Sequence, residues 1–139
     1  MRSALFILLF AIAGCAKTPA IHDIHLHNLE ETEVRIEPAK NQLTVIYFLS
    51  PECPLCINYS LALREIAAEF SNDSVAFFGV HASKWFTAEE VEEYQLKYGL
   101  DFPMLLDDGN KLAKVLGATV TPEVFVLNSK SQVLYSGKI

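Results

Sequence analysis

The sequence predicts an α/β domain with a central mixed β-sheet flanked by helices. Residues 43–49 are rich in β-branched and aromatic side chains and predict a strand. Residues 57–70 follow at helical spacing, and residues 74–81 are a second apolar run. The order strand, helix, strand implies parallel pairing through a right-handed crossover. Residues 122–127 and 132–137 flank a turn and predict an antiparallel hairpin, which makes the sheet mixed.

Shorter segments complete the predicted fold. Residues 21–29 alternate apolar and polar side chains, as a half-buried strand does, with His25 and His27 on the polar face. Thr87 and Glu90 match a capping box for a helix that ends near Gly99. The remaining predicted elements are a strand at 33–36, an apolar segment at 102–106 and a helix at 110–116.

Two cysteines, Cys53 and Cys56, lie where the first long strand hands over to the first helix. The unpaired N–H groups and the dipole of a helix start favour negative charge, so a thiolate at Cys53 is stabilised there. Pro54 suits the first helical turn, because its missing N–H has no partner in the helix. Cys56 follows within reach and can close a disulfide onto Cys53. We therefore predict that both cysteines are catalytic.

Composition limits the classes of function. The chain has 139 residues, enough for one domain, and a net charge of −6 from 11 basic and 17 acidic residues. No basic patch or stripe is visible, which argues against a nucleic-acid partner. We also expect no cofactor, because the cysteine pair can carry the chemistry by itself.

The N-terminus predicts export. Residues 1–14 combine Arg2 with a ten-residue apolar run, too short to span a bilayer, which takes roughly 20 residues. The sequence Ile12-Ala13-Gly14-Cys15 resembles the lipobox of bacterial lipoproteins. That resemblance implies cleavage after residue 14 and a diacylglycerol on Cys15. The alternative is an ordinary signal peptide with a chance cysteine.

This interpretation divides the chain into a signal peptide at 1–14, a tether at 15–21 and one domain at 22–139. It implies a lipid-anchored protein of the bacterial cell envelope that faces the periplasm. Ala16 stands where an aspartate tends to retain lipoproteins in the inner membrane, so the sequence favours the outer membrane. The cysteine count agrees with this division, because Cys15 takes the lipid and the other two cysteines pair.

From about residue 24 to the end, the chain resembles the thioredoxin-like redoxins of the TlpA and AhpC/TSA type. The resemblance depends on the CxxC together with Phe102-Pro103, Leu106-Asp107 and Val120-Thr121-Pro122, in this order. It implies a thioredoxin-like fold in which Pro122 is cis and packs beside the disulfide. It also implies that Thr121 offers its backbone to the substrate, so Thr121 and Pro122 are the predicted substrate-binding residues.

The sequence departs from that family at three places. Glu52 precedes the first cysteine where thioredoxins commonly have Trp, and a carboxylate there opposes thiolate formation. Tyr47 stands where many thioredoxins carry a buried acid, which leaves the proton transfer of Cys56 without an assigned group. The fold normally closes with a helix after the last hairpin, but this sequence stops at Ile139. We therefore expect a fragment that lacks the C-terminal helix. The alternative is a protein without this helix, in which one face of the sheet is partly uncovered.

The sequence thus predicts a membrane-anchored thiol–disulfide oxidoreductase that exchanges with protein thiols and disulfides, together with an unidentified redox partner. A copper-binding protein of the Sco kind is the main alternative, because thiolates suit Cu(I) and His22, His25, His27 or His81 could add ligands. Against it, Sco cysteines are separated by three residues rather than two. A peroxiredoxin would need Pro and Thr where this chain has Ile46 and Ser50. A redoxin that only binds its partner is the last alternative.

Overall fold

The computed structural model describes residues 20–71, 74–82 and 84–139. The signal peptide, Cys15, most of the tether and the predicted turn at 72–73 lie outside the described residues. Within those ranges, no helix has the length and apolar character needed to cross a membrane.

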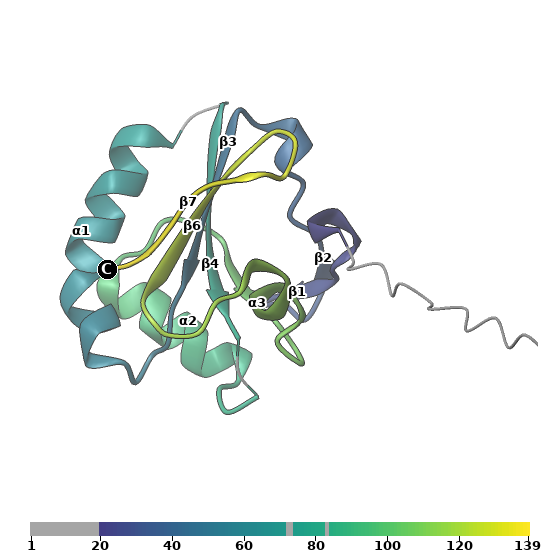
Figure 1. Ribbon diagram of the computed structural model, residues 1–139. Coiled ribbons are helices and arrows are strands. Elements are labelled where there is room, and N and C mark those ends of the chain that lie inside the picture. The colour runs from purple at the N-terminus through teal and green to yellow at the C-terminus, as the bar shows by residue number, and fades with distance from the viewer. Residues whose placement is uncertain (1–19, 72–73, 83) are drawn as a thin grey trace, which may run out of the picture.

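Seven strands form one mixed sheet in the order β2-β1-β5-β4-β3-β6-β7, with helices on both faces (Figure 1). The strands are β1 (Leu26–Asn28), β2 (Glu33–Val34), β3 (Leu43–Phe48), β4 (Val75–His81), β5 (Met104–Leu106), β6 (Glu123–Asn128) and β7 (Val133–Lys138). The helices are α1 (Pro54–Phe70), α2 (Ala88–Tyr98) and α3 (Lys111–Leu116). The predicted α/β class is therefore confirmed.

The centre of the sheet pairs as the sequence predicts. β3 and β4 are parallel and joined through α1, while β6 runs antiparallel to β3 and pairs antiparallel with β7. β4 also pairs parallel with β5. Because the carboxyl ends of β3 and β4 meet at one edge of the sheet, the start of α1 and His81 at the end of β4 lie at the same end of the molecule.

The two faces of the sheet carry separate apolar cores. Ile46 and Phe48 of β3 pack with α3 and the N-terminal segment. Val45 and Tyr47 point to the other face and pack with α1 and α2. This alternation follows from the two-residue repeat of a strand, and it explains why nearly all of β3 is buried.

Part of the second face is uncovered in the described part of the chain. An apolar hollow of about 390 Å³ lies between α1, β6 and β7. Ile66 and Phe70 of α1 and Tyr135 of β7 line it and are exposed. β7 is the last element of the described chain, and its end lies near α1 (Figure 1).

The N-terminal segment differs from the predicted strand at 21–29. Ile21–Asp23 form a 3₁₀ turn, and only Leu26–Asn28 pair as a strand. Ile21 and Ile24 are buried, because side chains three residues apart lie on the same side of such a turn. His22 is exposed rather than half-buried, and Ile21 belongs to the core although we assigned it to the tether.

The helix ends follow the predicted signals. Thr87 and Glu90 form both hydrogen bonds of a capping box at the start of α2, and Gly99 ends that helix in a left-handed conformation. α1 begins at Pro54, earlier than the apolar periodicity indicates. Its first turn therefore follows directly on Cys53, which is the feature that shapes the site described next.

Candidate active site

Cys53 is the N-cap residue of α1, and its sulfur lies among hydrogen-bonding groups. The backbone N–H of Cys56 donates to Cys53 Sγ over 3.5 Å. The Cys53 thiol donates to the backbone carbonyl of Thr121, 3.3 Å away and 68 residues later in the chain. These contacts bring the CxxC together with the predicted Thr121–Pro122 segment.

The surroundings of Cys53 favour its ionised form. Partial burial raises the pKa of the thiol, but the backbone N–H groups of Cys56 and Leu55 favour the thiolate. The side chains of Cys56 and Thr121 act in the same direction, and the net pKa of Cys53 lies below its ordinary value. Glu52, which we expected to oppose ionisation, is exposed to solvent.

Cys56 has the opposite properties. It is completely buried, and the backbone N–H of Ser50 donates to its sulfur over 3.4 Å. Burial raises the pKa of Cys56 to about 12; the Ser50 N–H works against this rise and the neighbouring Cys53 adds to it. The two sulfurs are free thiols, one partly accessible with a lowered pKa and one buried with a raised pKa.

Two buried hydroxyls that sequence reasoning missed meet behind the cysteines. Ser60 Oγ donates to the backbone carbonyl of Cys56 over 2.8 Å, and Tyr94 Oη donates to the same oxygen over 3.4 Å. The two hydroxyl oxygens are also 3.4 Å apart. Ser60 lies one turn after Cys56, a spacing that could have predicted its bond, but Tyr94 comes from α2 and has no signal in the local sequence.

The Thr121–Pro122 peptide bond is cis, as the family resemblance implies. The side chain of the next residue holds the loop in place. The Glu123 carboxylate, 9% exposed, accepts hydrogen bonds from the N–H groups of Thr119 (2.8 Å) and Val120 (3.4 Å). Sequence reasoning missed Glu123, because a glutamate at the start of a strand gives no indication of being buried.

Asp107 fixes the neighbouring segment in a similar way. Its carboxylate is 1% exposed and accepts hydrogen bonds from the first three N–H groups of α3, those of Lys111, Leu112 and Ala113. Asn110, the residue directly before the helix, makes no side-chain cap. Leu106-Asp107 belonged to the motif that carried the family resemblance, but the capping role of Asp107 becomes visible only in the structure.

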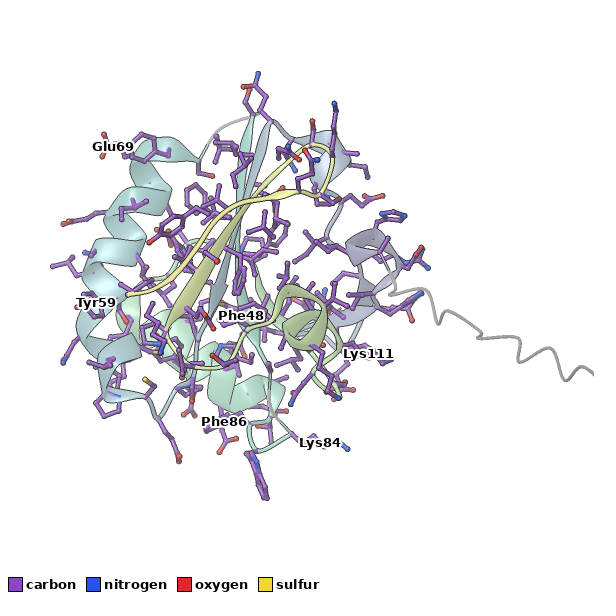
Figure 2. The ribbon with its side chains drawn as sticks, in the orientation of Figure 1. Phe48, Tyr59, Glu69, Lys84, Phe86 and Lys111 are labelled. Carbon is purple, nitrogen blue, oxygen red and sulfur yellow. The ribbon has the colours of Figure 1, made fainter. Side chains whose placement is uncertain are left out.

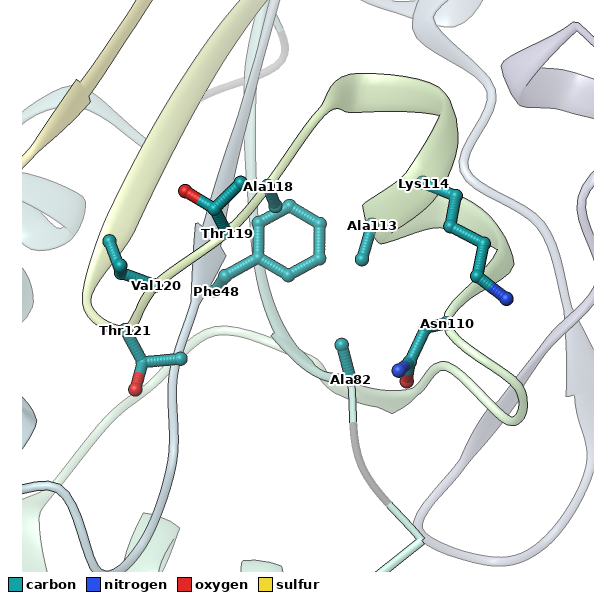
Figure 3. A pocket seen from close by; sticks show the side chains of 9 residues that line it. All are labelled: Phe48, Ala82, Asn110, Ala113, Lys114, Ala118, Thr119, Val120 and Thr121. Carbon is teal, nitrogen blue, oxygen red and sulfur yellow. The ribbon is translucent and has the colours of Figure 1, made fainter.

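A cavity of about 350 Å³ opens between α3 and the loop that carries Thr121. Phe48 lies in its middle, with Thr121 on one side and Lys114 on the other (Figure 3). A second cavity of the same volume shares Thr121 and Ala82 with the first. The residues that line it are Leu49, Ser50, Glu52, His81, Ala82, Trp85, Phe86 and Thr121.

His81 contributes the most unusual side chain of the second cavity. The residue is 1% exposed, and neither ring nitrogen has a hydrogen-bond partner in the described part of the chain. Burial lowers the pKa of His81 to about 4, so the imidazole is neutral at pH 7. Its ring meets the ring of Tyr94 edge-on, with centroids 6.1 Å apart.

The other histidines do not gather around the cysteines. His25 pairs with Glu33, and His27 Nδ1 lies 3.0 Å from a carboxylate oxygen of Asp108. Across residues 20–71, 74–82 and 84–139, no three Cys, His, Asp or Glu side chains are placed to hold a metal ion. The ligand set that a Sco-like copper site would need is therefore not assembled by these residues.

Tyr47, at the place of the buried acid in many thioredoxins, is also buried. Burial raises the pKa of Tyr47 to about 12. Its ring lies against those of Phe77 and Phe102, with centroids 6.0 and 5.6 Å away. Where many thioredoxins have a buried acid that can accept a proton, this protein therefore has an aromatic ring packed against two others.

A CxxC at the start of the first helix, beside a cis X-Pro bond on a mixed sheet of this order, defines a thioredoxin-like redoxin. The chain belongs to the AhpC/TSA family, whose profile matches residues 18–136. The family resemblance seen in the sequence is therefore confirmed.

The similar proteins include oxidoreductases and peroxidases. Sporulation thiol-disulfide oxidoreductase A of Bacillus subtilis is 28% identical over 84% of this chain and 72% of its own length. Thiol-disulfide oxidoreductase ResA of Halalkalibacterium halodurans is 20% identical over 78% of this chain and 61% of its own length. Chloroplastic peroxiredoxin Q of Oryza sativa is 25% identical over 86% of this chain and 58% of its own length.

Solved structures share the fold. The crystal structure of StoA from Bacillus subtilis matches with a TM-score of 0.71 and 24% identity, over 86% of this chain and 90% of that one. An uncharacterised conserved protein from Geobacillus kaustophilus matches with a TM-score of 0.75 and 24% identity, over 83% of this chain and 65% of that one. The thioredoxin-like fold therefore extends over most of the described residues.

Proposed function

We propose that this protein is a thiol–disulfide oxidoreductase whose substrates are protein thiols and disulfides. The observation that carries the proposal is the asymmetry of the two cysteines. Cys53 is accessible and has a lowered pKa, whereas Cys56 is buried and has a raised pKa. A nucleophile must be a thiolate that a substrate can reach, and a resolving thiol must be kept from reacting first.

The exchange takes place in two steps. The Cys53 thiolate attacks a substrate disulfide, so a bond forms between Cys53 Sγ and one substrate sulfur while the other substrate sulfur leaves as a thiolate. Cys56 then passes its proton to the substrate thiolate that left in the first step and attacks Cys53 Sγ, which releases the second substrate sulfur as a thiolate. Two electrons have passed to the substrate, and Cys53 and Cys56 share a disulfide. The reverse sequence oxidises a substrate dithiol.

Thr121 supports substrate docking in this scheme. Its carbonyl accepts a hydrogen bond from the Cys53 thiol, so the backbone of Thr121 borders the reacting sulfur. An extended substrate segment that pairs with this backbone as an added strand would bring its disulfide to Cys53. Pro122 has no N–H to donate, so the backbone hydrogen bonds to the substrate segment would come from Thr121.

The decisive experiment is insulin reduction with dithiothreitol as the electron source. We expect wild-type protein to accelerate the reaction, and Cys53→Ser to abolish the acceleration. Reduced Cys56→Ser protein from which dithiothreitol has been removed should accumulate a mixed disulfide with insulin that mass spectrometry detects, because no second thiol resolves it. Iodoacetamide should label Cys53 first, since a thiol with a pKa of about 12 is only about 10⁻⁵ ionised at pH 7. An active Cys53→Ser variant, or preferential labelling of Cys56, would reverse the assignment of roles.

A peroxidase is the second candidate, because chloroplastic peroxiredoxin Q is among the similar proteins. Against it, a buried Ile46 and the residue Ser50 occupy the places of the peroxiredoxin proline and threonine. The test is hydrogen peroxide consumption by the reduced protein. We expect a rate constant no greater than that of an ordinary thiol; rapid consumption that depends on Cys53 would favour the peroxidase.

We also propose that the protein acts outside the cytoplasm, anchored through a lipid on Cys15. The sequence around Cys15 and the oxidoreductase of Mycobacterium tuberculosis that is described as secreted, 18% identical to this chain, support the proposal. In a Gram-negative host, full-length protein should incorporate labelled palmitate and fractionate with outer membranes, and Cys15→Ala should abolish both. Incorporation that survives the substitution would remove the anchor.

A further inference from the structure

The cavity with His81 at its wall belongs to the same surface as the reactive cysteine. Two of its lining residues, Ser50 and Glu52, lie three and one residues before Cys53. A third, Thr121, has its carbonyl 3.3 Å from Cys53 Sγ. Phe86 lies at the end of the molecule where α1 begins (Figures 1 and 2). A polypeptide whose sulfur reaches Cys53 can therefore place a neighbouring side chain in this cavity.

The wall of the cavity is mostly apolar. Leu49 is buried, Phe86 is half-buried, and Trp85 stands at the opening with 88% of its surface exposed. At about 350 Å³, the cavity has room for one large side chain. An aromatic ring would gain most from such walls, because it buries a large area at a small cost in conformational entropy.

His81 adds a specific polar requirement. A buried imidazole without partners is costly, and the neutral ring offers one N–H donor and one nitrogen acceptor. Both nitrogens are covered in this structure, so the ring must turn toward the cavity before a substrate hydroxyl can bond to one of them. An aliphatic side chain would leave both unpaired. A cationic side chain in the cavity would lie beside a neutral ring without a buried counter-charge, which is unfavourable. The one carboxylate that lines the cavity belongs to Glu52, which is exposed to solvent. The hydroxyl of Thr44 also has no partner in the described chain, but it does not line this cavity.

We propose that this cavity is a specificity subsite for an uncharged aromatic side chain with a hydroxyl group, next to the reacting cysteine of the substrate, and that His81 hydrogen-bonds to that hydroxyl. The proposal rests on the proposed thiol–disulfide exchange and names its preferred substrate. The substrate is thus a polypeptide with tyrosine beside its disulfide-bonded cysteine. Such a site rejects an analogue without the hydroxyl, since the imidazole then stays unpaired.

The test is a set of short homodimeric peptide disulfides that differ only in the residue beside cysteine. Tyrosine, phenylalanine, alanine and lysine are placed before or after the cysteine. Pre-reduced full-length protein is mixed with each peptide, and the second-order rate constant is measured in a single turnover. In one of the two positions, tyrosine should react about fivefold faster than phenylalanine and on the order of 100-fold faster than alanine.

Variants isolate the role of His81. His81→Leu should bring the ratio of tyrosine to phenylalanine rates to about one, and His81→Gln should keep part of it. His22→Leu, the same change at an exposed histidine, should keep the full ratio. Trp85→Ala, at a highly exposed position, tests the wall without threatening the fold and should lower both aromatic rates toward the alanine rate. These ratios do not depend on the folded fraction, so a merely structural role of His81 would leave them unchanged.

Each outcome decides between the two proposals. Equal rates for all four residues, fastest reaction with lysine, or an unchanged tyrosine-to-phenylalanine ratio in His81→Leu would overturn the subsite. Failure to reduce any peptide or insulin would instead overturn the thiol–disulfide exchange itself.

Discussion

Buried polar side chains are hydrogen-bonded in one region of the molecule and unpaired in another. Just before α3 and at the start of β6, the carboxylates of Asp107 and Glu123 are buried and accept hydrogen bonds from five backbone N–H groups. In the second cavity, His81 is equally buried, yet both ring nitrogens lack partners among the described residues. Paired groups stabilise the backbone that they hold. An unpaired group costs stability, so its presence points to a partner that comes from outside.

The comparison predicts that substitutions in the two regions have effects of opposite sign. Removing a paired carboxylate should destabilise the fold, because it leaves buried N–H groups unsatisfied. Removing the unpaired imidazole should not. Natural proteins often give up stability at sites that serve function, and His81 fits that pattern.

The largest effect is expected at Asp107. Asp107→Ala removes the acceptor of three N–H groups of α3 and should lower the free energy of unfolding by about 3–5 kcal/mol. Asp107→Asn keeps one acceptor oxygen, so its free energy of unfolding should lie between those of Asp107→Ala and wild type. Urea denaturation measures both, with the exposed Asp101→Ala as the control. A loss below about 1 kcal/mol would mean that Asp107 does not hold α3.

The next effect concerns pH and His81. The pKa of His81 falls from 6.5 to about 4 on folding, because burial disfavours the charged ring. The titratable groups near it are Tyr94, whose ring it meets edge-on, and Glu52, which lines the same cavity. Between pH 6.5 and 4, the unfolded state therefore binds a proton that the folded state does not bind. Stability is fully present above pH 6.5, decreases as the pH falls, and levels off below about 4 after a loss of about 3 kcal/mol.

Denaturation of wild type and His81→Leu across this pH range checks the prediction. The variant should be at least as stable as wild type at pH 7, and the difference in its favour should grow as the pH falls. His22→Leu should follow the wild-type profile. Parallel profiles for wild type and His81→Leu would show that His81 is not the group that titrates.

A smaller effect is expected at Glu123. Glu123→Ala should cost about 1–3 kcal/mol, since Thr119 and Val120 lose their acceptor. Because these residues lead into Thr121, insulin reduction should also slow severalfold, while iodoacetamide labelling of Cys53 stays near the wild-type rate. Glu123→Gln keeps an acceptor and should recover most of both losses. Glu69→Gln, at the exposed end of α1, is the control for charge removal. Insulin reduction at full rate in Glu123→Ala would separate this carboxylate from substrate docking.

The sequence predicts the regular part of this structure well, because local signals dictate it. The apolar run of β3, the capping box of α2 and the N-cap position of Cys53 are all written within a few neighbouring residues. The N-terminal strand is partly wrong, since alternation over a few residues fits a 3₁₀ turn followed by a short strand equally well.

The groups that complete the site were not predictable, because each depends on a long-range contact. The Tyr94 hydroxyl reaches Cys56 from 38 residues away. His81 has an unremarkable place at the end of a strand, and only the packing of the second cavity makes its lack of partners visible. The burial of Glu123 follows from its register opposite Phe48 on β3, which a single sequence does not reveal.

The smallest effect is expected at Tyr94, which connects the buried hydroxyl of Ser60 behind the cysteines with His81. Its hydroxyl shares the carbonyl of Cys56 with Ser60, and its ring edge lies against His81. Tyr94→Phe removes only the hydroxyl, and Ser60 keeps its shorter bond of 2.8 Å to the carbonyl. The free energy of unfolding should therefore fall by no more than about 1 kcal/mol. Tyr98→Phe, on the neighbouring ring, is the matched control.

The same variant tests whether the hydroxyl cluster behind the cysteines is independent of the His81 cavity. Because the ring stays in place, His81 keeps the aromatic neighbour behind it, and the preference for tyrosine over phenylalanine peptides should not change. A Ser60→Ala, Tyr94→Phe double-mutant cycle should show coupling between the two hydroxyls, since they share one acceptor. A changed peptide preference in Tyr94→Phe would mean that the hydroxyl of Tyr94, and not His81 alone, sets the polarity of the cavity. The lack of partners at His81 would then no longer be the only feature that sets the substrate preference.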